Sequence, residues 1–148
     1  MSLTDKIMED VKIAMKSRDK DRVNTLRYLL SQLKYAKIAS KEDSLTPDQE
    51  ISVLLNAAKK HKEAIDIYKK AGKEDQIQKE QHEFDIISTY LPKQMSEAEV
   101  DAAISEFIDK TGATSLKDLG KVMGMAMKEL KGKADGKLVQ EIVKRKLA

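Results

Sequence analysis

The chain has 148 residues, enough for one sizeable core or two small ones, and length alone does not decide between them. It contains no cysteine, which excludes disulfides, thiolate metal sites and a cysteine nucleophile, and which leads us to expect a cytoplasmic protein. Charged residues make up 36% of the chain and no stretch approaches the ~20 apolar residues of a membrane span, so no membrane partner is expected. A net charge of +3 is too small by itself to indicate a nucleic-acid partner.

The first two predicted helices form the start of an all-α fold, which the low number of glycines and prolines also favours. Ser2 opens a helix over about residues 3–15, whose apolar residues recur at helical spacing. A second helix is predicted over about residues 21–41. Because Tyr28 and Tyr35 broaden its apolar face, we expect this helix to lie at the centre of a bundle.

The third and fourth predicted helices have clear local start and stop signals. Thr46 is a capping residue, and Pro47 fits the first position of a helix that continues for about 25 residues. The fourth helix is predicted over about residues 74–91. It should end there because the residue before Pro92 is disfavoured in the helical conformation.

A fifth helix begins with two devices at once, a capping box and a hydrophobic staple. Their four residues are Met95, Ser96, Glu99 and Val100. Gly112 should end this helix, and Ser115 with Asp118 should cap a sixth. We therefore expect an N-terminal four-helix bundle followed by a C-terminal three-helix domain. The predicted ranges are residues 1–92 and 93–148.

The most informative stretch is residues 120–148, where eight Lys or Arg residues stand against three acidic ones. Two apolar helical stripes flank a turn, in which Gly132 can end one helix and Asp135 can cap the next. This places Lys133 and Lys137 beside a helix N-terminus, whose free N–H groups and positive dipole end favour an anion. Asp135 occupies some of those donors. Few aromatic residues are near, so recognition of an RNA backbone is expected rather than base stacking.

Two glycines lie four residues apart inside the sixth predicted helix, where each costs about 1 kcal/mol relative to alanine. Close packing against another helix is the favoured explanation, and close approach of a phosphate backbone is the alternative. With the turn lysines, they complete the expected RNA-binding set. Its members are Gly120, Lys121, Gly124, Lys133 and Lys137.

Four sequence motifs, in this order along the chain, together resemble the YqeY family. They are residues 22–27 (RVNTLR), 90–95 (YLPKQM), 120–123 (GKVM) and 132–137 (GKADGK). The resemblance covers nearly the whole chain. It implies a helical bundle followed by a small three-helix module. That module is similar to the C-terminal tail of the B subunit of Asp/Glu-tRNA amidotransferases and to an appendage of some glutaminyl-tRNA synthetases. There it holds tRNA near the elbow and does no chemistry.

Annotation inherited from the amidotransferase would call this chain a carbon–nitrogen ligase with glutamine as amide donor. Such chemistry needs an activated nucleophile and a phosphate site. The chain has no cysteine, and its six glycines include no phosphate-cradling run, so no catalytic residue and no cofactor are expected.

A metal site is not expected either, because neither His61 nor His82 has a second histidine within reach on its own helix. Two arginines are interpreted as partners of structural salt bridges rather than as a second basic face. The expected pairs are Arg22 with Asp19 or Asp21, and Arg27 with Asp85 or Glu83.

The sequence thus predicts a non-catalytic accessory module that binds tRNA or another structured RNA through its C-terminal domain. One alternative is a helical protein–protein adaptor that docks on an aminoacyl-tRNA synthetase or an amidotransferase. A second is an enzyme subunit that contributes to amide transfer.

Overall fold

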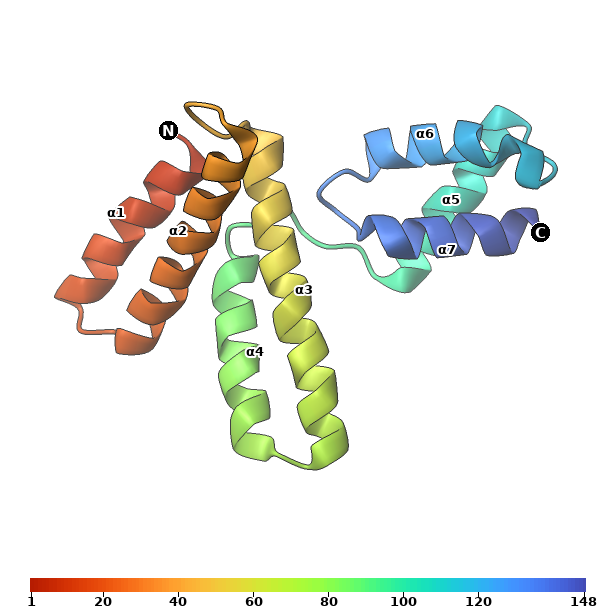
Figure 1. Ribbon diagram of the computed structural model, residues 1–148. Coiled ribbons are helices and arrows are strands. Elements are labelled where there is room, and N and C mark those ends of the chain that lie inside the picture. Colours follow the sequence, from red (N-terminus) through yellow and green to blue (C-terminus); the bar gives the residue numbers. More distant parts are fainter. The chain divides into compact units, whose positions relative to one another are not determined.

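The computed structural model describes all residues 1–148 and contains seven α-helices, one short 3-10 helix and no strand, which confirms the all-α prediction (Figure 1). It divides into two compact units, Met1–Leu91 and Pro92–Ala148. The first unit holds α1 (Leu3–Lys16), α2 (Lys20–Ser40), α3 (Pro47–Ala71) and α4 (Glu74–Ser88). The second holds α5 (Glu97–Thr111), η1 (Leu116–Asp118), α6 (Leu119–Glu129) and α7 (Gly136–Leu147). No helix is both long and apolar enough to cross a membrane. Independent folding of the two units stays a prediction.

The helix starts follow local side-chain chemistry. Three capping boxes are complete. In each, the capping residue just before the helix and the third residue of the helix exchange hydrogen bonds, side chain to backbone in both directions. The pairs are Ser2 with Asp5, Thr46 with Gln49, and Ser96 with Glu99. Two helices end at glycines in the left-handed conformation, Gly72 (φ 67°) and Gly112 (φ 69°), where a side chain would be strained.

The start of the sixth helix differs from the expected capping box. Ser115 caps the 3-10 helix η1 by accepting a hydrogen bond from the Lys117 N–H, and α6 follows directly from it. The Asp118 carboxylate instead accepts from the Thr114 N–H at 3.0 Å. The tighter 3-10 turn reverses the chain in few residues before α6 begins.

The core of the four-helix unit is formed where α1, α2, α3 and α4 meet near the start of α3. Its fully buried side chains include Ile7, Leu26, Leu29, Leu54 and Ile87. One carboxylate is buried with them: Glu50, only 2% exposed, accepts hydrogen bonds from the Thr4 N–H at 2.7 Å and from the Thr4 hydroxyl at 2.6 Å. A side chain from α3 thereby satisfies a free donor at the N-terminus of α1, which compensates for burial of its charge.

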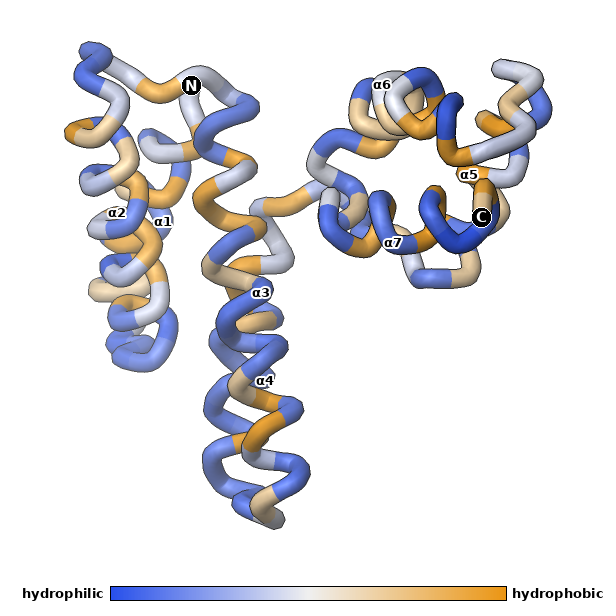
Figure 2. Tube along the Cα trace, turned by 45° about the vertical axis from the view of Figure 1, so that its right-hand side comes forward, coloured by the Kyte–Doolittle hydropathy of each residue, from blue (hydrophilic) through white to orange (hydrophobic).

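The distal part of the α3–α4 hairpin has almost no core. In Figures 1 and 2 these two helices continue beyond the ends of α1 and α2, and their outer part is largely hydrophilic. Among residues 62–83, Ile65 is the only buried side chain. The outer hairpin is therefore held by helix–helix contact along a single seam.

Helix α4 ends at Ser88 rather than at residue 91, and the next residues turn inward. The Tyr90 hydroxyl donates to the Asp10 carboxylate at 2.5 Å and accepts from the Arg22 guanidinium at 3.4 Å. Burial of the hydroxyl, followed by its hydrogen bond to Asp10, raises the pKa of Tyr90 well above its usual value.

Both arginine interpretations are wrong. The Arg22 guanidinium donates to the Tyr90 hydroxyl, as described above, and only the Arg22 backbone N–H donates to the Asp19 carboxylate, at 3.2 Å. Arg27 is exposed and its guanidinium lies 3.7 Å from the Met15 sulfur instead of pairing with an acidic residue of α4.

The two tyrosines expected in the apolar face of α2 are not in the core. Tyr28 is 39% exposed and Tyr35 is 65% exposed. They line an open groove of about 300 Å³ between α2 and α3, with Gln32, Asn56 and Lys60 among the other lining residues. The second helix is therefore buried along a narrower stripe than its composition indicates.

Helices α5, α6 and α7 surround the second core. Its buried residues are Val100, Ile104, Phe107, Val122, Ala126, Leu130, Val139, Ile142, Val143 and Leu147. Met95 packs against this core from the residue preceding the Ser96 cap, as the staple predicts.

Candidate nucleic-acid interface

The turn between α6 and α7 is fixed by its own backbone and by the segment that leads into the three-helix unit. Leu130 accepts hydrogen bonds from the N–H groups of Lys133, at 2.9 Å, and Ala134, at 3.3 Å. Gly132 adopts φ 76°, the left-handed conformation expected from the sequence, although it lies two residues beyond the cap Leu130. The turn is thus a defined structure rather than a loose loop.

Two further hydrogen bonds attach this turn to the connecting segment. The Met95 N–H donates to the Lys133 carbonyl at 2.8 Å, and the Gln94 side-chain amide donates to the Gly132 carbonyl at 2.7 Å. The sequence contains no signal for these contacts, because the partners are 38 residues apart.

The two lysines predicted at the turn are both exposed. Lys133 precedes the cap of α7, and Lys137 is its second helical residue. The Asp135 side chain accepts from the Lys137 N–H at 3.3 Å, as the sequence indicates, so one N-terminal donor of α7 is already satisfied. An anion at this turn would therefore be held mainly by the lysine side chains.

The packing explanation of the two glycines in α6 is wrong. A Cβ atom built on Gly120 or Gly124 would meet nothing within 4 Å, and both residues are exposed. No neighbouring helix needs the missing side chains. The glycines instead leave a strip of bare helix backbone on the surface.

Lysines flank this bare strip. Gly120, Lys121, Gly124 and Lys128 are all exposed and, by helical spacing, share one side of α6; we call this set the glycine–lysine face. The sequence interpretation omitted Lys128, which the i, i+4 spacing from Gly124 could have indicated. None of the ion pairs in the structure involves Lys121 or Lys128.

The structure separates the five predicted residues into two groups. Gly120, Lys121 and Gly124 lie in the first half of α6, whereas Lys133 and Lys137 lie beyond its other end. At 1.5 Å per residue, Lys121 is about 13 Å along the helix axis from Leu130. Lys128, in the last turn of α6, lies between the two groups.

Two cations near the end of α7 are engaged with α5. Near the end of α7, the Lys146 ammonium lies 2.8 Å and the Arg145 guanidinium 3.0 Å from the Asp101 carboxylate of α5. The hydrogen bond from Lys146 is the main cause that lowers the pKa of Asp101. Lys121, Lys128, Lys133 and Lys137 take no part in these ion pairs.

Comparison with known proteins identifies related chains. Residues 4–147 match the family described as Yqey-like protein. A fungal relative from Pyrenophora tritici-repentis, "Altered inheritance of mitochondria protein 41, mitochondrial", is 27% identical over 93% of this chain and 79% of its own length. The Kluyveromyces lactis protein of the same name is 31% identical over 88% of this chain and 68% of its own.

A shorter match relates the chain to part of an archaeal amidotransferase. One component of the glutamyl-tRNA(Gln) amidotransferase of Thermococcus sibiricus is 42% identical over 57 residues, which are 36% of this chain and 9% of that component. The similarity to amidotransferases is therefore confined to a small part of a much larger protein.

The fungal names correct one expectation. The relatives in Pyrenophora and Kluyveromyces are designated mitochondrial, which contradicts the expected cytoplasmic location. The expectation failed because the lack of cysteine excludes disulfides but does not distinguish one reducing compartment from another.

The family match spans nearly all residues, from 4 to 147. The chain belongs to the Yqey-like protein family.

Proposed function

We propose that this chain is a non-catalytic accessory protein that binds the phosphate backbone of tRNA through its three-helix unit. The observation that carries the proposal is the glycine–lysine face of α6. Its two glycines have no packing neighbour, yet Gly124, in the interior of α6, destabilises an exposed helix by about 1 kcal/mol relative to alanine. Such a cost is explained if an external backbone approaches the helix where side chains are missing.

The charges around the bare strip favour a phosphate backbone as that partner. Lys121 and Lys128 flank it, and the exposed Lys133 and Lys137 continue the positive charge past the end of the helix. Each lysine ammonium can contact a phosphate oxygen without reading a base, so binding would depend strongly on salt and weakly on sequence. The absence of tryptophan and the low aromatic content, 4% of the chain, agree with backbone contact rather than base stacking.

The choice of tRNA rests on the relatives. One chain similar to this one over 57 residues is a component of an enzyme named for glutamyl-tRNA(Gln). The match covers only 9% of that component, which suits a shared binding module better than a shared catalytic domain. The lack of cysteine and of a glycine-rich phosphate loop in the sequence supports a non-catalytic role.

A salt titration of tRNA binding tests the proposal. Filter binding of unmodified tRNA by the full chain, at several salt concentrations, should give a linear fall of log affinity against log salt. Changing Lys133→Ala together with Lys137→Ala removes two exposed cations of the turn. If each contacts one duplex phosphate, the slope should become less steep by up to about 1.8, at about 0.9 per contact.

The matched control is Lys62→Ala with Lys69→Ala, which removes the same charge from two exposed positions of α3. This pair should leave the slope almost unchanged. An equal effect of both pairs would mean diffuse charge attraction and would reject the turn as a specific contact. No binding by the parent chain at low salt would reject the RNA proposal and favour a protein–protein adaptor.

A further inference from the structure

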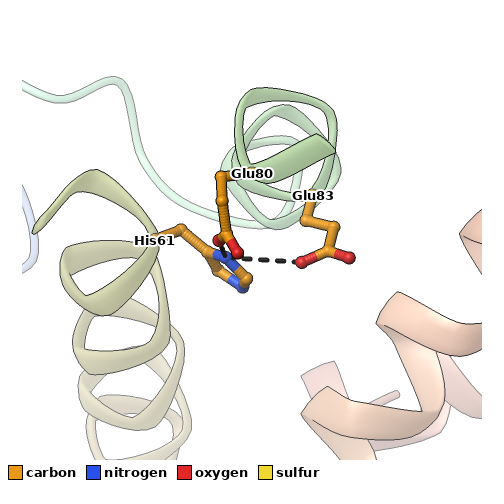
Figure 3. Close-up of side chains that lie close together, drawn as sticks. All are labelled: His61, Glu80 and Glu83. Atoms are coloured by element: carbon orange, nitrogen blue, oxygen red, sulfur yellow. Dashed lines mark hydrogen bonds and ion pairs between the residues drawn. The ribbon is translucent and has the colours of Figure 1, made fainter. Parts of the chain in front are cut away.

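One histidine and two carboxylates converge between the two helices of the long hairpin. His61 projects from α3, and Glu80 and Glu83 project from successive turns of α4 toward its ring (Figure 3). The His61 Nδ1 atom lies 2.5 Å from an oxygen of Glu80 and 3.5 Å from an oxygen of Glu83. The three ligand-type atoms all lie within 4.8 Å of one another.

The cluster is sheltered, and its charge is unbalanced. The side chains of His61, Glu80 and Glu83 are 13%, 20% and 25% exposed. Both carboxylates have His61 as their ion-pair partner, and neither pairs with a lysine or arginine. Two carboxylates so close together repel each other, and one imidazole cannot neutralise both even when protonated. A divalent cation would compensate both negative charges.

We propose that His61, Glu80 and Glu83 form a binding site for one divalent transition-metal ion. A neutral imidazole nitrogen and two carboxylate oxygens are donors that suit Zn²⁺ and Mn²⁺, and three protein ligands leave coordination positions open for water. Glu80 and Glu83 are three residues apart on α4, the spacing that puts two ligands on one helix face. Tetrahedral zinc holds its nitrogen and oxygen ligands at ~2.0–2.2 Å, which places the ligand atoms roughly 3.3–3.6 Å from one another. Rotamer adjustments of about an ångström would therefore complete the site.

The place of the site in the fold gives it a structural role. It lies where the core of the four-helix unit ends, because Ile65 is the only buried side chain among residues 62–83. A metal bound to both helices would clamp the hairpin at that point. Reasoning from the sequence missed the site because it looked for ligands on the histidine's own helix, whereas the carboxylates come from another helix, 19 and 22 residues along the chain.

Calorimetric titration of the untagged full chain with Zn²⁺ and separately with Mn²⁺ tests this inference, and the chain supplies its own control. His82 is exposed on α4 and has no part in the cluster. The parent chain and His82→Ala should bind one equivalent of at least one of these ions at micromolar concentrations. His61→Ala should weaken that binding at least about tenfold, since even outer-shell changes weaken metal sites 10–100-fold.

Glu83→Gln is a second variant that keeps the Glu80–His61 hydrogen bond and the size of the side chain. It should weaken metal binding at least about tenfold while the helical circular dichroism of the metal-free chain stays unchanged. The same loss in His82→Ala as in His61→Ala would overturn the assignment. So would the absence of saturable binding of either ion, which would identify the cluster as an ion pair only.

Discussion

Replacing Gly124 by alanine should stabilise the three-helix unit and weaken RNA binding at the same time. Gly124 lies in the interior of α6, is exposed, and has nothing within 4 Å of the position where a Cβ atom would stand. Alanine therefore adds no steric conflict and removes the excess conformational entropy that glycine loses on folding. The two effects have different physical origins, so their combination is a stringent test.

The expected gain in the free energy of unfolding is about 1 kcal/mol, the difference between glycine and alanine in the interior of a helix. For a unit of this size it corresponds to a rise in melting temperature of about 4–8 °C. Native-state hydrogen exchange of the buried amides of Val139, Ile142 and Val143 reports the opening of this unit within the full chain. Their exchange should slow by about fivefold for each kcal/mol gained.

Gly112→Ala is the matched control. A Cβ atom on Gly112 would also meet nothing within 4 Å, but the backbone there has φ 69°. The same substitution should therefore destabilise the unit by about 1–2 kcal/mol, because alanine is strained in the left-handed conformation. Both glycines have open space around them. If alanine raises the free energy of unfolding at one and lowers it at the other, the difference must come from the backbone conformation.

Binding of tRNA should become weaker in Gly124→Ala, since the added methyl group keeps a phosphate backbone away from α6. The salt slope should change less than in the lysine double variant, because no charge is removed. Destabilisation of the three-helix unit by this change would contradict the open environment of Gly124. Stabilisation with unchanged RNA affinity would refute the proposed contact between the glycines and RNA.

Two more predictions concern the four-helix unit and the boundary. Tyr90→Phe should lower stability by about 1–2 kcal/mol by removing the hydrogen bond to Asp10. Because folding raises the pKa of Tyr90, the parent chain should keep this contribution to its stability below pH ~10 and lose it as the pH rises further. Urea unfolding at a series of pH values should show this loss in the parent and not in Tyr90→Phe. A fragment of residues 92–148, which contains a complete core, should unfold cooperatively by circular dichroism; a fragment without helix at room temperature would show that the core needs the rest of the chain.

The elements of the fold were largely predictable because their signals are local. The capping box at Thr46 and Gln49 acts across three residues, and the glycine at 72 needs only its own backbone conformation. Such contacts form whatever the rest of the chain does, so the sequence alone indicates them.

The contacts that were not predicted join residues far apart in the chain. Glu50 accepts from Thr4 across 46 residues, and Tyr90 donates to Asp10 across 80. Helical periodicity places a residue on a face, but it does not reveal which helix covers that face or how far the cover extends. For this reason Tyr28 was expected in the core and lies at its edge, and Gly124 was expected at a helix contact and lies in the open.

The hydrogen bonds from Gln94 and Met95 make the structure of the α6–α7 turn depend on a segment far away in the sequence. The donors belong to the segment that leads into the three-helix unit, and the acceptors belong to the turn that carries Lys133. An anion that stabilises the turn would therefore also stabilise its hydrogen bonds to Gln94 and Met95. Thermodynamic linkage makes the effect reciprocal, so a partner that stabilises this segment would raise the affinity of the turn for phosphate by the same factor.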